Sequence, residues 1–392
     1  MSLSPWIKSI KIHQPDEGHR QASWLELFVD LGFVVAISSL TSILEEGLSL
    51  TRLVTYLVVF FAVFWLWNRF TWYATYYDNG DVLFRISYLL IVFPILGIVA
   101  NIDNILAHEY AAATGWYIAL DTVLLWLWGR VWYQATSFKA NARSFFLSYL
   151  IGLLLVVASL WIPGWGKYLC WGGAFLVEMI GPIIGWEQPE GELPVHTGHV
   201  VERHGLFTII LLGEGVVSVS YNFKHLSGMM TGGWLLLAYL SVVALWWIYF
   251  DHGYGFATQL SKNLRNTFIL GYGQFLVFSS VALITISLEF GLHHHLAVTD
   301  HSTNVPSHFS ELLLYSQGTF LIILSSVQWL ISDRNPTNIY WTRCLAGGAL
   351  IVLNFLAGPF SFATALIIGT VMLVGVSIND SYGWGMVRKR EA

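Results

Sequence analysis

Twelve apolar segments of 18 to 24 residues, each with few charged side chains, follow one another along the chain. A helix needs roughly 20 apolar residues to cross the hydrocarbon core of a bilayer. Runs such as Leu147–Leu160 do not alternate between apolar and polar residues, as the strands of a membrane β-barrel would. The sequence therefore predicts an all-α polytopic membrane protein. Its expected spans are 23–43, 52–72, 82–102, 114–134, 144–162, 167–186, 203–222, 230–250, 266–289, 311–331, 341–358 and 360–379.

The composition is not that of a water-soluble globular protein. Only 11% of the residues are charged, against about 25% in soluble domains. The net charge of −5 gives no reason to expect a nucleic-acid partner. Cys170 and Cys344 both fall inside apolar segments, so we interpret them as small core residues rather than as a disulfide or metal site.

Lysine and arginine placement predicts the orientation. With both termini in the cytoplasm, 16 of the 19 basic residues fall on the cytoplasmic side, which agrees with the positive-inside rule. No cleavable signal peptide is expected, because the polar first 23 residues run directly into the first span. The last two expected spans are separated only by Gly358-Pro359, so they form either a tight hairpin or one broken helix.

The expected organisation is a cytoplasmic segment 1–22, one transmembrane domain 23–379 and a basic cytoplasmic tail 380–392. A weak repeat at an offset near 180 residues aligns Trp67 and Arg85 with Trp247 and Arg265. It predicts two parallel six-helix repeats, with halves 23–186 and 203–379, an arrangement that many secondary transporters share.

Two of the predicted loops are longer than the others. The segment 187–202 is acidic, and 290–310 is a predicted outer loop that holds His293-His294-His295 and His308. Such histidines could capture Zn²⁺ or Ni²⁺. Because the ligand spacing is not fixed, we expect a solvated loop and no metal site.

Charged residues inside the spans are the strongest functional candidates, since each costs at least about 2.5–3.5 kcal/mol at the bilayer centre. Glu26 and Asp30 are four residues apart, so they lie on one helix face, one turn from each other. Two carboxylates in such a setting either share a proton or hold a cation. Alternatively, one of them pairs with an arginine of a neighbouring helix and fixes the packing.

The seventh expected span begins with His199, Glu202 and Arg203 and continues to Glu214. Arg203 and Glu214 are about 16 Å apart along a helix, too far to pair, so each needs a partner elsewhere. Glu26 or Asp30 could serve Arg203. His199 and Glu202 could equally be residues wetted at the headgroup level.

The topology places further charges at the same membrane level as Glu26 and Asp30: Arg69, Arg85, Arg203, Asp251 and Arg265. These charged residues either converge on one cavity or form several separate ion pairs, and the sequence does not distinguish the two arrangements. Asp121 and Glu178 are further ionisable residues within spans. Pro94 and Pro182 either break their helices, as in transporter cavities, or only kink them.

Glu26-Leu-Phe-Val-Asp30-Leu, His199-x-x-Glu202-Arg203-x-Gly205-Leu206-Phe207 with Leu212-Gly213-Glu214, and Trp246-Trp247-x-Tyr249-Phe250-Asp251 resemble motifs of the bacterial low temperature requirement A family. The resemblance covers about residues 20 to 380, with Val29 where the family more often has Phe. It implies a multi-pass protein of the bacterial inner membrane, named for a cold-growth phenotype, with signature residues at Glu26, Asp30, His199, Glu202, Arg203, Glu214 and Asp251.

These features favour a proton- or cation-coupled secondary transporter of a small molecule over the other classes. No G-x-x-x-x-G-K-[ST] motif occurs, so any pumping would draw on an ion gradient. A non-catalytic sensor or assembly protein is the main alternative. A lipid-modifying enzyme is less favoured, because the H-E-x-x-H and G-x-S-x-G motifs are absent. We expect no cofactor and no partner beyond the bilayer and a transported solute, and the oligomeric state stays open.

Overall fold

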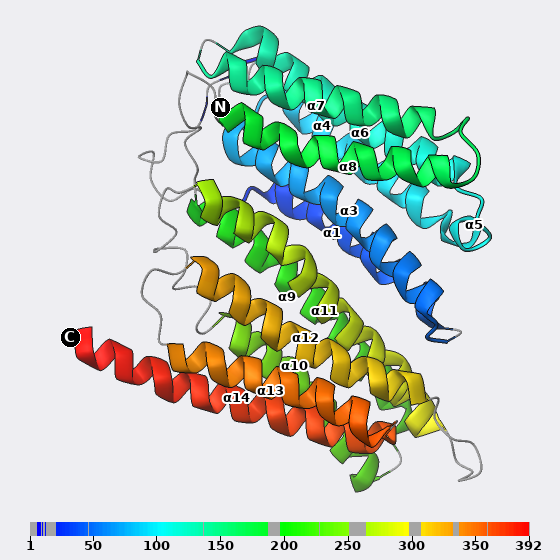
Figure 1. Ribbon diagram of the computed structural model, residues 1–392, viewed down its shortest axis with the longest axis vertical. Helices are drawn as coiled ribbons and strands as arrows, with labels where there is room; N and C mark the ends of the chain where they lie inside the picture. The colour runs from blue at the N-terminus through cyan, green and yellow to red at the C-terminus, as the bar shows by residue number, and fades with distance from the viewer. Residues whose placement is uncertain are drawn as a thin grey trace. The chain divides into compact units, whose positions relative to one another are not determined.

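The computed structural model describes residues 6–8, 10, 12, 21–45, 47–135, 137–186, 197–226, 228–250, 264–297, 307–331, 337–358 and 360–391. These residues form α-helices and one short 3₁₀ helix (Figure 1). Twelve of the helical stretches are long and apolar enough to cross a membrane, and each overlaps one expected span. The prediction of an all-α polytopic fold is therefore confirmed.

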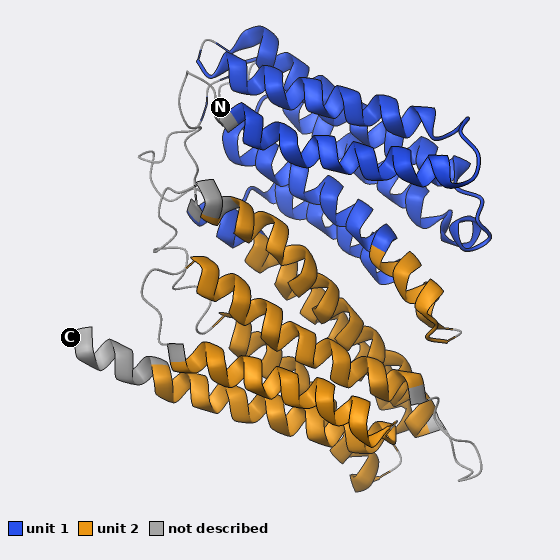
Figure 2. Ribbon diagram, in the orientation of Figure 1, with its two compact units in different colours: residues 1–40, 58–203 blue, residues 41–57, 204–392 orange. Residues whose placement is uncertain are grey.

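The chain divides into two compact units (Figure 2). The first unit comprises residues 1–40 and 58–203, and the second comprises residues 41–57 and 204–392. In the first unit lie α1 (Trp24–Ser39), α4 (Val82–Val99), α5 (Ile102–Leu106), α6 (Ala111–Gln134), α7 (Lys139–Ala158) and α8 (Trp165–Trp186). It also contains α3 (Leu50–Tyr77) from residue 58 onward and α9 (Thr197–Asn222) as far as Arg203.

The second unit contains the remainder of α3 and α9, together with α2 (Ser42–Glu45) and the 3₁₀ helix η1 (Phe223–His225). Its other helices are α10 (Met229–Phe250), α11 (Leu264–Ala297), α12 (Ser307–Ile331), α13 (Thr337–Ala357) and α14 (Phe362–Glu391). The predicted sequence duplication and the orientation of the termini stay predictions.

Close packing of α7 against α8 depends on residues that lack large side chains. Asn141 of α7 donates a hydrogen bond to the carbonyl of Gly185, and Ser144 Oγ donates to the carbonyl of Gly181 at 3.1 Å. Pro182 lies between these glycines, and α8 continues through it, as α4 continues through Pro94. Neither proline breaks its helix in this structure.

The last two spans are separate helices that pack against each other. Gly358 follows α13 with φ +74°, a left-handed conformation that favours glycine and commonly ends a helix. The chain resumes as α14 at Phe362 and stays helical to Glu391, through the expected tail 380–392. The structure thus supports the hairpin rather than one broken helix.

The expected outer loop 290–310 is wrong in its first part. Helix α11 continues to Ala297, so His293, His294 and His295 are helical. Ring packing supports the extra turns, since His295 lies 5.2 Å from Trp234 and His294 stacks on Phe309 at 5.7 Å between ring centroids. His308 belongs to α12, and the remaining loop residues, 298–306, lie outside the described part of the chain. Among the described residues, no group of three His, Cys, Asp or Glu side chains could hold a metal ion.

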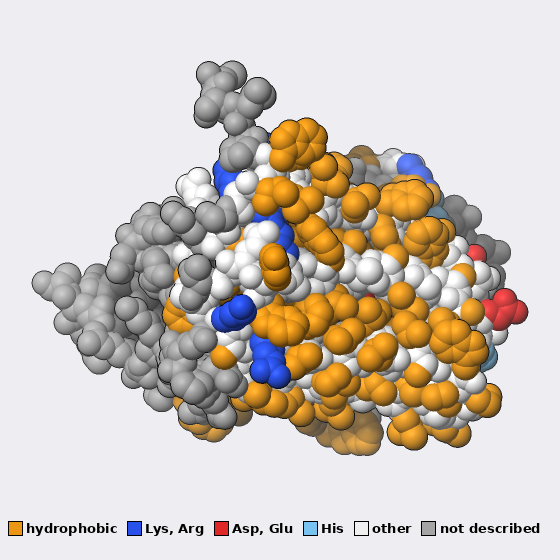
Figure 3. Space-filling model, turned by 90° about the horizontal axis from the view of Figure 1, so that it is seen from above, with side chains coloured by type: hydrophobic (Ala, Val, Ile, Leu, Met, Phe, Trp, Pro, Cys, Tyr) orange, Lys and Arg blue, Asp and Glu red, His pale blue; other side chains and the backbone are white. Residues whose placement is uncertain are grey.

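The face in Figure 3 is covered mostly by hydrophobic side chains. Large apolar residues point outward from the helices; Phe93 is 67% exposed and Leu169 is 76% exposed. Exposure of this kind suits lipid, whereas the buried positions include charged residues such as Glu26, Arg69 and Arg203. The chain is therefore a multi-pass integral membrane protein in contact with the bilayer.

Asp81, outside the spans, joins the start of α4 to α6 and the N-terminal segment. Its Oδ1 accepts the Phe84 backbone N–H at 2.7 Å, and its Oδ2 accepts that of Lys8 at 3.0 Å and pairs with Arg130. Burial would raise the pKa of the Asp81 carboxyl, but the hydrogen bonds from Arg130, Lys8 and Phe84 outweigh burial and hold the pKa below its ordinary value.

This arrangement predicts a pH-dependent contribution to stability. The folded pKa lies below the unfolded value of about 3.9, so the contribution is complete above that pH and is lost as the pH falls through the folded pKa. Asp81→Asn keeps a good helix cap but loses the ion pair. We expect it to lower the free energy of unfolding at pH 7 by about 1.5–3 kcal/mol, with the difference from wild type shrinking below about pH 4. Unfolding of both proteins in detergent across pH 3–7 measures this; a pH-independent difference would contradict it.

Candidate functional site

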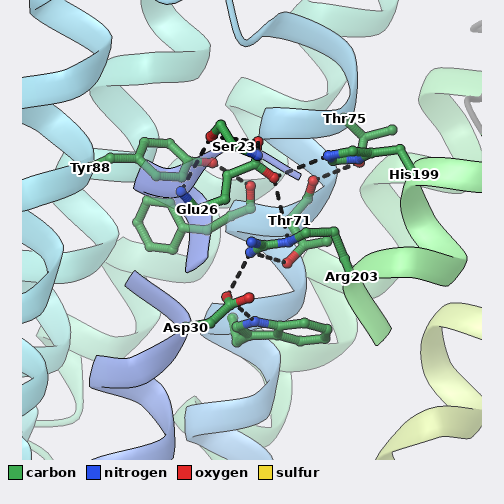
Figure 4. Close-up of polar contacts among 10 residues, drawn as sticks. Ser23, Glu26, Asp30, Thr71, Thr75, Tyr88, His199 and Arg203 are labelled. Atoms are coloured by element: carbon green, nitrogen blue, oxygen red, sulfur yellow. Dashed lines mark hydrogen bonds and ion pairs between the residues drawn. The ribbon is translucent and has the colours of Figure 1, made fainter. Parts of the chain in front are cut away.

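The candidate site lies in the first unit and is built on the first turn of α1. Ser23 caps this helix, and a capping box forms in which the Glu26 N–H donates to Ser23 Oγ at 3.3 Å. In return, Glu26 Oε1 accepts Ser23 Oγ–H at 3.0 Å and the Ser23 N–H at 3.4 Å. Such reciprocal bonds satisfy backbone donors that a helix start leaves open. One oxygen of Glu26 is therefore fixed by its own helix, and the other, Oε2, faces α9 (Figure 4).

Asp30 lies one turn further along α1 and is fully buried. Its Oδ1 accepts two donors, Arg203 Nη2 at 2.7 Å and the indole Nε1 of Trp67 at 2.8 Å. The Arg203 guanidinium also approaches Glu26, with Nε 3.5 Å from Oε2, and donates to Thr71 Oγ1 at 3.4 Å. The sequence-based expectation that Glu26 or Asp30 partners Arg203 is thus confirmed, and both carboxylates contribute.

His199 lies one turn before Arg203 on α9, with Nε2 3.1 Å from Glu26 Oε2. Its Nδ1 is 3.0 Å from Thr75 Oγ1, whose hydroxyl donates to the Thr71 carbonyl at 2.8 Å. Because a hydroxyl carries only one hydrogen, these two contacts favour the tautomer of His199 in which Nδ1 donates to Thr75. The contact between Nε2 and Glu26 Oε2 becomes an ion pair when the imidazole carries a second proton.

The formal charges of the four side chains at this site do not balance. We call Glu26, Asp30, His199 and Arg203 the Glu26 cluster; each side chain is at most 2% exposed. Among these four side chains, two carboxylates against one guanidinium leave one negative charge, which is costly in a buried site. One proton on the contact between Glu26 and His199 makes the cluster neutral. The arrangement can therefore bind and release a proton within the span.

Three residues of this site were not predicted from the sequence to belong to it. Trp67, Thr71 and Thr75 recur every four residues on α3, and all three contact the Glu26 cluster. That spacing places them on one helix face. A polar stripe at positions 67, 71 and 75 within an apolar helix is the signal that could have identified α3 as the third wall of the site.

The other predicted residues lie elsewhere. Glu202 is half-buried on α9, with one buried oxygen that has no hydrogen-bond partner among the described residues. Glu214 is half-buried in the second unit, close enough to Glu289 of α11 for their charges to interact. Arg85 is exposed on the first turn of α4. Asp251 lies outside the described residues. Arg69 does not join the Glu26 cluster and pairs instead with Asp121 and Glu178.

Comparison with known proteins identifies the family of this chain. The model of the family described as bacterial low temperature requirement A protein matches residues 21–378, which include the whole Glu26 cluster. An uncharacterized protein of Rhizobium meliloti (strain 1021) is 24% identical over 375 residues, covering 90% of this chain and 88% of that protein. No solved structure matches the chain significantly. Because the family match covers most of its length, the chain belongs to the bacterial low temperature requirement A family.

Proposed function

We propose that the protein is a proton-coupled secondary transporter of a small molecule, in which the Glu26 cluster binds the coupling proton. One observation carries the proposal: four buried side chains set two carboxyl groups against one guanidinium, and His199 Nε2 lies 3.1 Å from Glu26 Oε2, where one further proton would balance their charges. Ionisable residues inside spans mark ion and proton pathways more often than they serve packing alone. The proposal places the chain in the bacterial inner membrane with both termini in the cytoplasm, and it includes no catalytic step.

The coupling follows from the energetics of the proton. With the proton present, the Glu26 cluster is neutral and stays buried. Once the proton leaves, one uncompensated charge remains in a dry site, and any conformation that admits water to Glu26 is favoured. A proton that binds two conformations with different affinity shifts their populations, which is the requirement for coupling to solute movement.

The test begins with a ligand. Purified protein is screened by thermal shift against amino acids, nucleosides, polyamines, ions and lipid headgroups; a ligand at about 100 times its Kd should add roughly 2.7 kcal/mol of apparent stability. Uptake of each hit into proteoliposomes is then measured under an imposed pH gradient. We expect the gradient to drive accumulation by the wild type, and Glu26→Gln and Asp30→Asn to abolish it.

Asp103→Asn is the matched control, because Asp103 is an exposed carboxylate on α5. It should accumulate the ligand as the wild type does. If both cluster variants also did so, proton coupling at this site would be refuted. Binding without transport would instead support a sensor or assembly protein, and chemical change of an added lipid would support an enzyme.

A further inference from the structure

A second buried ionic cluster lies in the first unit, and the proposed transport cycle does not use it. Arg69 of α3 pairs with Asp121 of α6 and, through Nη1, with Glu178 Oε2 of α8 at 2.8 Å. The side chains of these three residues, here called the Arg69 cluster, are each 1% exposed. Like the Glu26 cluster, it sets one guanidinium against two carboxyl groups.

The surrounding side chains that the structure describes supply hydrogen bonds but no second positive charge. Trp65 Nε1 donates to Glu178 Oε2 at 2.7 Å, and Arg69 Nη2 donates to the Tyr117 hydroxyl at 3.3 Å. The ring of Tyr149, from α7, lies 5.2 Å from the guanidinium carbon of Arg69. Tyrosine is neutral at pH 7. Among the described residues, the titratable and charged groups that face the cluster from α3, α6, α7 and α8 are Arg69, Asp121, Glu178, Tyr117 and Tyr149.

Two carboxyl oxygens of the cluster have no hydrogen-bond donor among the described residues. They are Asp121 Oδ2 and Glu178 Oε1, and both are buried. Glu178 Oε1 lies against Gly152 of α7, so closely that a Cβ atom there would overlap it. A buried carboxylate normally gathers donors on both oxygens, whereas a neutral carboxyl group tolerates an apolar neighbour far better.

We propose that the Arg69 cluster is a second proton-binding site, in which Asp121 and Glu178 together hold one proton at neutral pH. This inference stands apart from the proposed transport, because it concerns the charge of the resting protein. The proton makes the cluster neutral, just as the proton on the Glu26–His199 contact does for the first site.

Helix α3 forms one wall of both proton sites. Trp65 and Arg69 are four residues apart and contact the Arg69 cluster, whereas Trp67, Thr71 and Thr75 contact the Glu26 cluster. Two residues along an α-helix correspond to about 200° of rotation, so the two sets lie on opposite faces. Both clusters therefore contact the same helix. Gain or loss of a proton at one cluster acts on α3, which also contacts the other cluster.

Infrared spectroscopy of the purified full-length protein in detergent tests the proposal without any ligand. A protonated carboxyl group has a C=O stretching band that is separate from the carboxylate bands. At pH 7 we expect Glu178→Gln to lose the intensity of one such group. Asp121→Asn should lose the same intensity, because the single remaining carboxyl then ionises to pair with Arg69.

Both substitutions keep the size of the side chain and remove at most one charge, and the unfolding temperature of each variant shows that it is folded. If one variant fails to fold, the other still decides. Asp103→Asn, at an exposed position, should leave the band unchanged. Loss of the band in either cluster variant supports the second proton site, and an unchanged band in the folded variants would overturn it. The result does not depend on whether the protein transports anything.

Discussion

Arg203→Met is expected to lower the free energy of unfolding by about 3–5 kcal/mol at pH 7, the usual cost of removing one partner of a buried ion pair. Methionine fills a similar volume but supplies no charge and no donor. Among the described donors, Asp30 would keep only the Trp67 indole, and the remaining side chains of the Glu26 cluster would carry one net negative charge even with its proton in place. Unfolding in mixed micelles measures the loss.

Two further variants isolate the charge effect. In the double variant Arg203→Met, Asp30→Asn the cluster is neutral again, so we expect it to recover most of the lost stability. Arg85→Met removes an exposed arginine of α4 and should change the free energy of unfolding by no more than about 0.5 kcal/mol. If Arg203→Met matched Arg85→Met in stability, the buried ion pairs would not have the role assigned to them.

Gly347→Ala and Gly348→Ala, the same substitution at adjacent positions, should change stability in opposite directions. A Cβ on Gly347 would lie 2.6 Å from the backbone oxygen of Gly318 on α12, and one on Gly318 would lie 2.7 Å from the oxygen of Gly347. Backbone atoms cannot move aside as side chains do, so α12 and α13 would have to separate. Small residues that permit such close approach are a main source of helix association in membranes.

We expect Gly347→Ala to destabilise the protein by about 1–3 kcal/mol through overpacking. A Cβ on Gly348 meets open space, so alanine there should stabilise α13 by about 0.5–1 kcal/mol through its lower backbone entropy. The two variants would then differ by about 1.5–4 kcal/mol in unfolding experiments run side by side. Equal stability would show that α12 and α13 do not meet at this glycine pair.

Much of the fold could be predicted because the thickness of the bilayer fixes the length of an apolar span. All twelve expected spans overlap membrane-length helices. Their ends were less predictable, since a helix can continue through polar residues. The histidines at 293–295 show this: they are polar, so they suggested a loop, yet they extend α11 because aromatic rings of neighbouring helices pack against them.

The candidate site was predictable only in part. The four-residue spacing of Glu26 and Asp30 and the absence of a partner for Arg203 on its own helix led to the correct pairing. Sequence alone does not say which helices adjoin, so Arg69 was placed at the same depth as Arg203 without its partners on α6 and α8. The buried indole donors at Trp65 and Trp67 were missed because tryptophan in such chains usually signals an interface with headgroups.

The pairing of Asp30 with Arg203 also constrains how the protein is made. The two residues are 173 positions apart, and at about 5–20 residues per second the ribosome needs roughly 9–35 s to reach the second after the first. During that time α1 has to enter the membrane without its arginine. If the carboxyl groups of α1 are protonated, this helix can insert without a buried charge. Once α9 has been inserted, Arg203 can form its ion pair with Asp30. The acidity of the compartment next to the inserting helix should therefore affect the yield of correctly assembled protein.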